Sequence, residues 1–337
     1  MTRVLVTGGA GFIGSHVADA LLARGHQVTV LDDLSGGFPD NVPGHARFVA
    51  ASVVDHAAID RLFAESRFDY VYHLAAYAAE GLSHFIKRFN YTNNVIGSVN
   101  LINAAINNGV KGFVFASSIA VYGRSTVVPM TEETAPEPED PYGIAKHAVE
   151  RELAASREMF GLDYMIFRPH NVYGPRQNIA DRYRNVVGIF MNQILQDQPM
   201  TIFGDGTQTR AFSYIDDVAP IMAAALEEPR AWNQVFNVGA DRPWQLNELA
   251  ERVAAAMGVT PRIRHLEPRH EVLNAHSSHE KIRSVLGSGD ATTLDDGLRA
   301  MAEWVKKRGA RASKSFEGIE VTKNMPPSWR PNPQDRG

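Results

Sequence analysis

A glycine-rich segment, Thr7-Gly8-Gly9-Ala10-Gly11-Phe12-Ile13-Gly14, follows the short apolar run at residues 4–6. Glycine has no Cβ, so the backbone can turn tightly and approach a pyrophosphate that then rests on the N-terminus of the next helix. Gly8, Gly11 and Gly14, with Phe12 and Ile13 between them, are therefore predicted to contact a dinucleotide. A glycine turn without a nucleotide is the plainer alternative. Either way, the order of strand, turn and helix restricts the fold to one that begins with a βαβ unit.

A carboxylate stands where the second apolar run ends. Asp32 lies 18 residues after Gly14, and a carboxylate at this distance accepts hydrogen bonds from the adenosine ribose hydroxyls. It would repel a 2′-phosphate, and no Lys or Arg occurs between Arg24 and Arg47 to offset that repulsion. We therefore expect NAD rather than NADP as the cofactor. Three further positions after the same run are assigned to the cofactor site: Asp33, Ser35 and Gly36.

Short apolar runs alternate with longer segments of helical spacing. Strands are predicted at residues 4–6, 28–31, 47–49, 70–74, 112–116, 163–168 and 236–239, and helices at 14–24, 90–108 and 246–257. The strands alternate little between apolar and polar residues, as is typical of strands buried on both faces. This pattern predicts an α/β fold, namely a Rossmann-type doubly wound parallel sheet with a smaller α/β lobe at its carboxyl edge.

The domain boundaries follow changes in composition. Residues 1–178 and about 212–240 are expected to form the dinucleotide-binding domain, and about 179–211 with 241–310 the smaller lobe. Residues 311–337 are polar and rich in proline, which predicts an extended tail; a partly disordered terminus is the alternative.

Composition excludes several classes of protein. The net charge of −4 argues against a nucleic-acid binder, and the absence of cysteine excludes disulfides, thiolate catalysis and cysteine-ligated metals. No apolar run approaches the length that spans a bilayer, and the first strand begins too early to leave room for a signal peptide. We expect a cytoplasmic protein. Four histidines, His265, His270, His276 and His279, fit no common ligand spacing, so we expect structural or solvated roles and no metal.

The catalytic prediction rests on three residues. Tyr142 and Lys146 are four residues apart, which places them on one face of a helix. A tyrosine is a poor base near neutral pH, but a nearby ammonium and an oxidised nicotinamide favour its phenolate, which can then take a hydroxyl proton. Ser118 lies 24 residues before Tyr142, at a strand end, and can hydrogen-bond the same substrate oxygen. A chance pair of helix neighbours is the alternative for the Tyr-Lys spacing taken alone.

Taken together, these motifs resemble the extended short-chain dehydrogenase/reductase superfamily, in its nucleotide-sugar epimerase/dehydratase branch, with the UDP-glucose (UDP-galactose) 4-epimerases nearest. The resemblance covers about residues 3–308 and is carried by HLAA from His73, NNVIGS from Asn93, PYGIAK from Pro141, RPHNVYGPRQ from Arg168 and FGDGTQTRAFSYIDDV from Phe203, besides the segments above. It implies an NAD-dependent 4-epimerase of a nucleotide sugar, UDP-hexose above all, that acts through a transient 4-keto sugar.

The resemblance also implies further contacts. On the cofactor side these are Ser52, Val53, Leu74, Ala75, Ala76, Asn94, Ala116, Pro169 and His170, besides Tyr142 and Lys146. On the substrate side they are Asn171, Asn185, Val186, Thr201, Phe203, Arg210, Arg269 and Ala275, besides Ser118 and Tyr142. Independently of the resemblance, a guanidinium offers a planar fork of donors that suits phosphate oxygens.

Positions at which this chain departs from the family pattern reduce the number of reactions that it is expected to catalyse. Related 4,6-dehydratases carry an Asp-Glu pair where this chain has Ile119-Ala120, so dehydration is disfavoured. Glucuronate 4-epimerases tend to carry threonine at Asn171, which weakens that alternative without excluding it. Small Ala275 would leave room for an N-acetyl group on the sugar. A reductase and a non-catalytic NAD sensor remain as alternatives, the latter because fold does not fix function.

For several residues the sequence leaves two possible roles open. Tyr173 and Phe212 are either stacking partners for uracil or core, and Arg182 and Arg184 either touch substrate or lie in a solvated loop. The resemblance implies a homodimer through a four-helix interface built from residues 90–108 and 142–159, although packing onto the sheet explains some of the same apolar positions.

Overall fold

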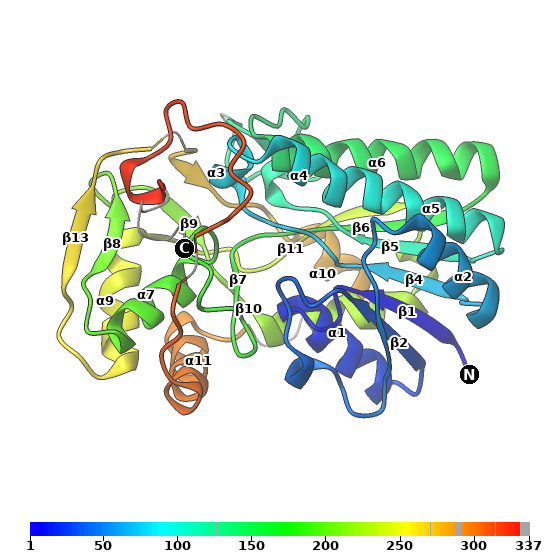
Figure 1. The fold of residues 1–337 in the computed structure, drawn as a ribbon, viewed down its shortest axis with the longest axis horizontal. Helices are drawn as coiled ribbons and strands as arrows, with labels where there is room; N and C mark the ends of the chain where they lie inside the picture. The colour runs from blue at the N-terminus through cyan, green and yellow to red at the C-terminus, as the bar shows by residue number, and fades with distance from the viewer. Residues whose placement is uncertain (126, 270, 288–290, 314, 331–337) are drawn as a thin grey trace.

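The computed structural model describes residues 1–125, 127–269, 271–287, 291–313 and 315–330. Its centre is a seven-stranded parallel sheet in the order β11-β6-β5-β4-β1-β2-β3 (Figure 1). The strands are β1 (Arg3–Thr7), β2 (Gln27–Asp32), β3 (Arg47–Ala50), β4 (Tyr70–His73), β5 (Gly112–Ala116), β6 (Asp163–Pro169) and β11 (Gln234–Val238). The predicted Rossmann-type parallel sheet is confirmed, and the strand order reverses direction between β1 and β4.

Helices cover both faces of this sheet, because successive strand residues point to opposite sides. Val4 and Val6 of β1 face a core shared with α1 (Phe12–Ala23) and α8 (Ala219–Ala224), while Leu5 faces the opposite core. That second core is formed with α2 (His56–Ser66), α5 (Gly97–Asn107) and α6 (Pro141–Phe160). Figure 1 shows the long α6 beside α5, with α1 on the other side of the strands. Burial on both faces explains why the strands read as continuous apolar runs.

The helix predicted at residues 90–108 is interrupted. It consists of α4 (Lys87–Tyr91), a π-helical turn over Thr92–Ile96 and α5. Short α3 (Glu80–Ser83) precedes it. A π turn inserts one residue into the helical repeat and is frequent at functional sites. Here it brings Asn94 into a buried position beside the chain that leaves β4.

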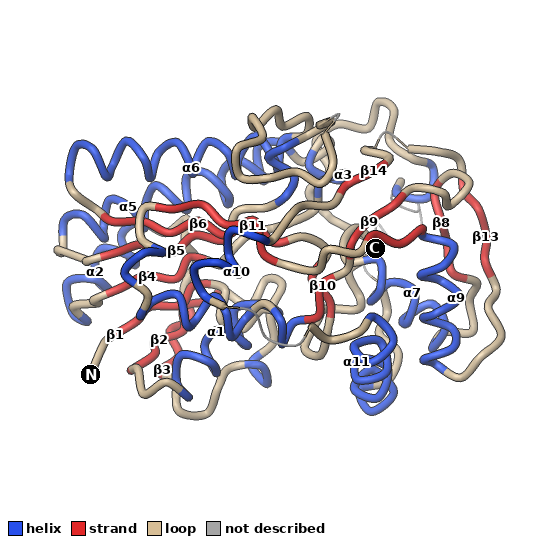
Figure 2. Tube along the Cα trace, turned by 180° about the vertical axis from the view of Figure 1, so that it is seen from behind, coloured by secondary structure: helices blue, strands red, loops and turns tan. Residues whose placement is uncertain are grey.

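A smaller lobe lies beyond the carboxyl edge of the sheet, as Figure 2 shows. It contains α7 (Val186–Leu195), α9 (Leu246–Met257), α11 (Leu294–Arg308) and the strands β8 (Met200–Phe203), β9 (Thr209–Ala211), β12 (Pro243–Gln245), β13 (Ile263–Leu266) and β14 (Asn274–Ala275). The pair β7 (Val172–Tyr173) and β10 (Ser213–Tyr214) joins lobe and sheet. Helix α10 (Glu280–Leu286), which lies within the segment assigned to the lobe, instead packs against β11.

The chain after α11 carries no strand in its described part, in keeping with an extended tail. It nevertheless packs on the protein, and Met325 and Trp329 are buried. The final residues, 331–337, of the predicted tail lie outside the described residues, as does His270. Across the described ranges, no helix is long and apolar enough to cross a membrane.

Candidate active site

A cavity of about 500 Å³ lies at the carboxyl ends of the central strands, between the sheet and the smaller lobe. This is the edge at which open parallel sheets bind ligands, where the strand order reverses. The residues around it come from both parts of the molecule, from Gly8 near the N-terminus to Ala275 of β14. A ligand bound here would therefore contact the dinucleotide turn at one end and the lobe at the other.

The glycine turn is built so that only glycine fits. Gly8 has a positive φ of +70°, and a Cβ on Gly14 would lie 2.1 Å from the Gly8 carbonyl oxygen. Gly11 is the N-cap of α1, which has no side-chain cap. Backbone N–H groups at this helix start are available for an anion, and the dipole of α1 favours negative charge there. The residues present thus fit the pyrophosphate of a dinucleotide.

Asp32 ends β2 beside this turn and lines the cavity. Its carboxylate accepts hydrogen bonds from Ala10 N at 3.0 Å and Leu34 N at 2.8 Å. Burial raises the pKa of Asp32, and these backbone donors partly oppose the increase. The side chain is held at the position where a ribose hydroxyl of a dinucleotide would reach it.

Most residues predicted for the cofactor line this cavity. They are Gly8, Gly11, Phe12, Ile13, Gly14, Asp32, Asp33, Ser35, Gly36, Val53, Leu74, Ala75, Ala76, Ala116, Tyr142, Lys146 and Pro169. Ser52 lies behind the wall and donates a hydrogen bond to the Asp33 carboxylate at 2.9 Å. The side-chain amide of Asn94 makes two hydrogen bonds with the backbone of Tyr77. Its Oδ1 accepts from the Tyr77 N–H, and its Nδ2 donates to the Tyr77 carbonyl oxygen. Both residues thus support wall residues, and their direct contact with a cofactor stays a prediction.

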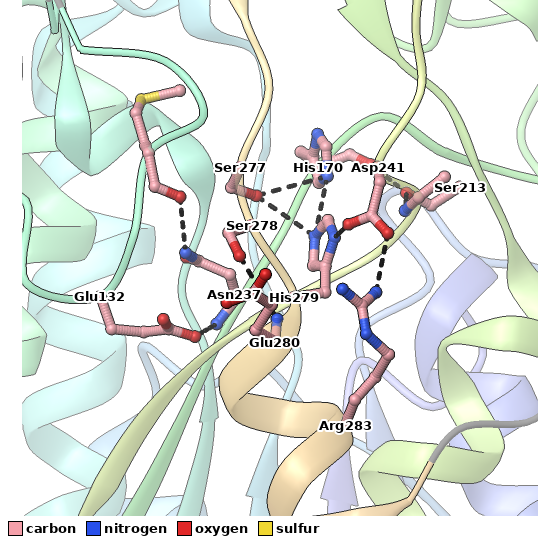
Figure 3. A network of polar contacts seen from close by, with 12 residues as sticks. Glu132, His170, Ser213, Asn237, Asp241, Ser277, Ser278, His279, Glu280 and Arg283 are labelled. Carbon is pink, nitrogen blue, oxygen red and sulfur yellow. Dashed lines mark hydrogen bonds and ion pairs between the residues drawn. The ribbon is translucent and has the colours of Figure 1, made fainter.

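His170, the third predicted cofactor residue of this kind, is not among the residues that line the cavity. Figure 3 shows it in a polar network with His279 and Asp241. Its Nε2 is 3.2 Å from Nε2 of His279, and the two rings stack nearly parallel. His279 Nδ1 is 2.7 Å from the Asp241 carboxylate, which also accepts from Arg283. Burial lowers the pKa of both histidines, so both are neutral near pH 7. This network joins the end of β6 to α10, and the described residues contain no group of side chains arranged to hold a metal ion.

Tyr142 stands at the beginning of α6, and the local sequence explains why the helix begins there. The N-cap Asp140 accepts hydrogen bonds from the N–H groups of Tyr142 and Gly143, each at 2.9 Å, and Pro141 occupies the first helical position. Tyr142 is 5% exposed and lines the cavity. Burial raises the pKa of Tyr142, the charge of Glu80 raises it further, and a hydrogen bond with Ser118 lowers it.

Lys146 lies one helical turn after Tyr142 and is fully buried. Its ammonium donates to the Ala116 carbonyl at 2.8 Å and lies 5.8 Å from the centre of the Tyr142 ring. Burial lowers the pKa of Lys146 to about 7, with Glu150 opposing the decrease. A cation at this distance favours the tyrosine phenolate. Ser118, Tyr142 and Lys146, predicted together from sequence, thus converge on one wall of the cavity.

A buried ion pair supports this wall from behind. Arg168 of β6 binds both oxygens of Glu150 on α6, at 2.9 and 2.6 Å, and each side chain is only 5% exposed. Ser117 donates to the same carboxylate at 2.5 Å, and Arg168 also donates to the Tyr122 hydroxyl at 2.8 Å. A bidentate pair of this kind fixes the orientation of both side chains. It therefore ties the catalytic helix to the strand beside it.

The residues predicted for the substrate also line the cavity: Ser118, Tyr142, Asn171, Asn185, Val186, Thr201, Phe203, Arg210, Arg269 and Ala275. Arg210 and Arg269 lie beside one carboxylate, that of Glu271, at 3.7 and 3.0 Å. The carboxyl of Glu80 also faces both arginines in this cavity, so two guanidinium groups lie beside two acidic side chains. Arg182 and Arg184 line the cavity too, whereas Tyr173 and Phe212 belong to the core.

Four carboxylates that line the cavity are not predicted from the sequence: those of Glu80, Glu139, Asp140 and Glu271. Glu80 is exposed toward the cavity from α3, and the loss of bulk water there together with the charge of Asp140 raises the pKa of Glu80. Asp140 itself carries a recognisable signal, because an Asp before a proline at a helix start is a typical N-cap. Glu80 carries no such signal, since only the tertiary fold brings α3 beside Tyr142.

Comparison with known proteins agrees with this geometry. The sequence profile of the NAD dependent epimerase/dehydratase family matches residues 4–239. The chain is 36% identical to the UDP-glucose 4-epimerase of Mycolicibacterium smegmatis over 313 residues, covering 91% of this chain and 99% of that protein.

Solved structures are similar over the same extent. The UDP-glucose 4-epimerase of Thermotoga maritima with UDP-glucose superposes with a TM-score of 0.87 at 36% identity, covering 91% of this chain and 99% of that one. The UDP-glucuronic acid 4-epimerase of Bacillus cereus, in complex with UDP-glucuronic acid and NAD, gives a TM-score of 0.83 at 30% identity, covering 91% and 100%. The glycine turn, the Ser-Tyr-Lys wall and this agreement over nine-tenths of the chain lead to one conclusion: the protein belongs to the NAD dependent epimerase/dehydratase family.

Proposed function

We propose that the protein is an NAD-dependent 4-epimerase of a nucleotide sugar, with a UDP-hexose as the substrate. The observation that carries the proposal is the convergence of Ser118, Tyr142 and Lys146 on a cavity that also contains the glycine turn. The UDP-glucose 4-epimerases among the relatives support the same reaction. Asp32 and the absence of basic residues between Arg24 and Arg47 favour NAD over NADP.

The reaction would use Tyr142 as the proton acceptor. Its phenolate, favoured by the Lys146 ammonium, takes the proton from the sugar O4 hydroxyl, while Ser118 hydrogen-bonds the same oxygen. NAD, when bound, supplies the hydride acceptor for C4 and returns the hydride in the same turnover, so its net consumption is zero. Between the two transfers the 4-keto sugar must rotate and present its other face. Tyr142 then returns the proton to O4.

Arg210 and Arg269 are proposed to bind the diphosphate of the substrate. Both line the cavity on the lobe side, where they are paired with Glu271 and lie near Glu80, and a diphosphate would bring further negative charge to these two cations. A guanidinium pairs with phosphate oxygens through two parallel N–H donors. Asn171, Asn185, Val186, Thr201 and Phe203 complete the proposed substrate wall. Ala275 would leave room for an N-acetyl group, so the N-acetylhexosamine pair belongs in the same proposal.

A UDP-glucuronate 4-epimerase is the second candidate. It is favoured by Arg182, a cation at the cavity that could meet a sugar carboxylate, whereas Arg184 is already paired with Asp181 at 2.6 Å. The carboxyl of Glu80 lines the same cavity and disfavours binding of a sugar that carries its own carboxylate. A 4,6-dehydratase is disfavoured, because Ile119 and Ala120 line the cavity where those enzymes carry an acidic pair.

A homodimer in the cytoplasm is also part of the proposal. Ile96, Ile144 and Met159 are exposed by 52%, 41% and 75% on the helices predicted to form the interface. Apolar side chains grouped on an outer helical face favour association. Light scattering should give the mass of a dimer for the wild type, and Met159→Asp should shift it toward the monomer. A monomeric wild type would refute this interface.

Proton NMR of the purified protein with UDP-glucose, UDP-galactose, UDP-N-acetylglucosamine and UDP-glucuronate tests the reaction. We expect a new anomeric signal for one epimer pair, at an equilibrium reached from both sides without added NADH. Turnover of UDP-glucose without any on UDP-N-acetylglucosamine would refute the steric role of Ala275. A silent panel would refute UDP-sugar epimerisation.

A further inference from the structure

The segment after α11, residues 309–330, crosses from the smaller lobe to the sheet domain. We call its described part the strap. It begins at α7, where the backbone of Arg311 pairs with the Asn192 side chain at 2.9 and 3.0 Å. It reaches the other side of the molecule at α4, where the Glu320 carboxylate accepts from the N–H groups of Arg88 and Phe89. Figure 1 shows it in orange to red, rising from α11 past α3 and then turning at the top of the molecule back toward the lobe.

The strap contributes two aromatic anchors to the outer side of the cavity wall. Phe316 packs on Phe89 and Tyr77, with ring centres 4.9 and 5.4 Å apart, and its N–H donates to the Tyr183 hydroxyl at 3.1 Å. Tyr77, Phe89 and Tyr183 all line the cavity. The anchor therefore lies directly behind residues that a ligand would touch.

Trp329 is the second anchor and is only 3% exposed although it lies near the end of the chain. Its ring is 5.4 Å from Tyr183 and 5.9 Å from Phe203, in edge-to-face contacts. A Cβ on Gly81 would lie 2.8 Å from the Trp329 ring, so glycine at this position makes room for it. Burial of this kind indicates a built contact rather than a loose terminus.

Arg269 connects this anchor to the proposed substrate site. Its guanidinium carbon lies 4.6 Å from the centre of the Phe203 ring and 5.5 Å from that of Trp329. The two rings attract the cation and restrict the plane of its donors. Arg269 also donates to Glu271 through Nε and Nη2, at 3.3 and 3.0 Å, and lies within reach of the charge of Glu80, and its side chain lines the cavity.

The strap is an addition to the common framework. The compared relatives are matched over 99–100% of their own lengths, yet cover 91% of this chain. The motif resemblance ends near residue 308, where α11 also ends. The part of this chain that the relatives do not cover has about the length of the segment beyond α11. The contacts of Trp329 are therefore additional to the contacts within the fold that the relatives share.

We propose that the strap supports the nucleotide-sugar site from behind its wall, and that Trp329 is a positioning residue that holds Arg269 ready for the diphosphate. The inference rests on the proposed function, because it takes the diphosphate as the ligand of Arg269. Loss of the Trp329 ring would free the guanidinium to rotate and would weaken binding of the nucleotide without touching the Ser118, Tyr142 and Lys146 wall.

Calorimetric titration of the NAD-loaded, full-length protein with UDP tests this role. We expect Trp329→Ala to raise the UDP dissociation constant about two- to thirtyfold, which is the range that one cation–π contact contributes. If the protein is active, KM should rise with kcat unchanged. The matched control is Trp232→Ala, which removes a tryptophan stacked on Tyr70 away from the cavity and should leave UDP binding unchanged. Wild-type affinity in a folded Trp329→Ala protein would overturn the proposal.

Hydrogen exchange of the wild-type protein provides a second test that needs no variant. The N–H groups of Glu320 and Val321 bond the Phe85 carbonyl, at 2.8 and 3.2 Å, so their exchange reports the seating of the strap. UDP should slow their exchange, and an unchanged rate at saturating UDP would overturn the proposal. UDP binding is measured without turnover, so this test is independent of the proposed reaction. If the protein epimerises no sugar but its UDP affinity depends on Trp329, the proposed reaction is refuted and the role of Trp329 is supported.

Discussion

Removal of Arg168 should measure how much the buried ion pair behind the catalytic helix contributes to stability. Burial acts to raise the pKa of Glu150, but the hydrogen bonds and charge of Arg168, with further hydrogen bonds from His147 and Ser117, outweigh it, and the pKa of Glu150 lies below its usual range. In Arg168→Met the carboxylate would stay buried, at about 5% exposure, without its cation. Breaking such a pair from one side costs about 3–5 kcal/mol, a large part of the roughly 5–15 kcal/mol that stabilises a typical protein.

The loss should depend on pH. In the wild type, the depressed pKa of Glu150 contributes stability above the pKa of the unfolded chain, and this contribution disappears as pH falls through the folded value. In the variant, Glu150 keeps Ser117 and His147 but loses its guanidinium partner, so we expect its pKa to rise, and protonation relieves the penalty at lower pH. Urea unfolding followed by circular dichroism at pH 7.5 and 5.5 should therefore show a loss of about 3–5 kcal/mol at the higher pH and a smaller loss at the lower.

A matched control lies on the same helix. Arg157 pairs with Asp163 at 2.7 Å, but the two side chains are 46% and 42% exposed. Arg157→Met should cost less than about 1 kcal/mol, because exposed pairs contribute little. The double variant Glu150→Gln/Arg168→Met should be more stable than Arg168→Met at pH 7.5. A loss below about 1 kcal/mol in Arg168→Met, or one that is equal at both pH values, would refute the reasoning.

Four further substitutions test the site. Tyr142→Phe should fold, retain NAD and lose activity by about 10²- to 10⁴-fold, the contribution of a general base; wild-type rates would remove the tyrosine from the mechanism. Asp32→Ala should weaken NAD retention by about 10- to 100-fold, the value of hydrogen bonds to a charged group, and unchanged retention after gel filtration would contradict the ribose contact. Gly14→Ala should abolish NAD binding, because its Cβ would lie 2.1 Å from the Gly8 carbonyl oxygen, and NAD absorbance in the purified variant would disprove this. Glu80→Gln removes a negative charge that raises the pKa of Tyr142, so the acid limb of the pH–rate profile should move to lower pH; an unmoved limb would mean that the charge is not felt.

The central sheet could be predicted because its signals are local. Each strand is buried on both faces and therefore reads as an apolar run, and the turn after β1 requires glycine at Gly8 and Gly14 for steric reasons visible in the sequence. Helical spacing places Tyr142 and Lys146 on one face, but their catalytic assignment also needs the glycine turn, Asp32 and Ser118, because such a pair often occurs by chance. The strands, the turn and the helical spacing depend on neighbours within a few residues, so a single sequence suffices to find them.

The remaining features depend on contacts between distant segments. His170 follows β6 and was placed at the cofactor through the family resemblance, but it packs on His279, which is 109 residues away. Nothing local to either histidine reports that proximity. The packing of Trp329 is hidden for the same reason, since its partners come from α3, the lobe and the loop before α7. A polar, proline-rich composition suggests an extended chain but not where it lies.

The position of β11 has a consequence for the order in which a ribosome would release this chain. β11 completes one edge of the sheet by pairing with β6, in a register that joins Gln234 to Met165 and Val238 to Pro169. Until residues 234–238 leave the exit tunnel, the growing protein carries an open, apolar strand edge beside its catalytic helix. Such edges invite pairing with other chains. Translation of the intervening segment is thus a window in which the nascent protein is most exposed to aggregation and in which a chaperone would bind it to greatest effect.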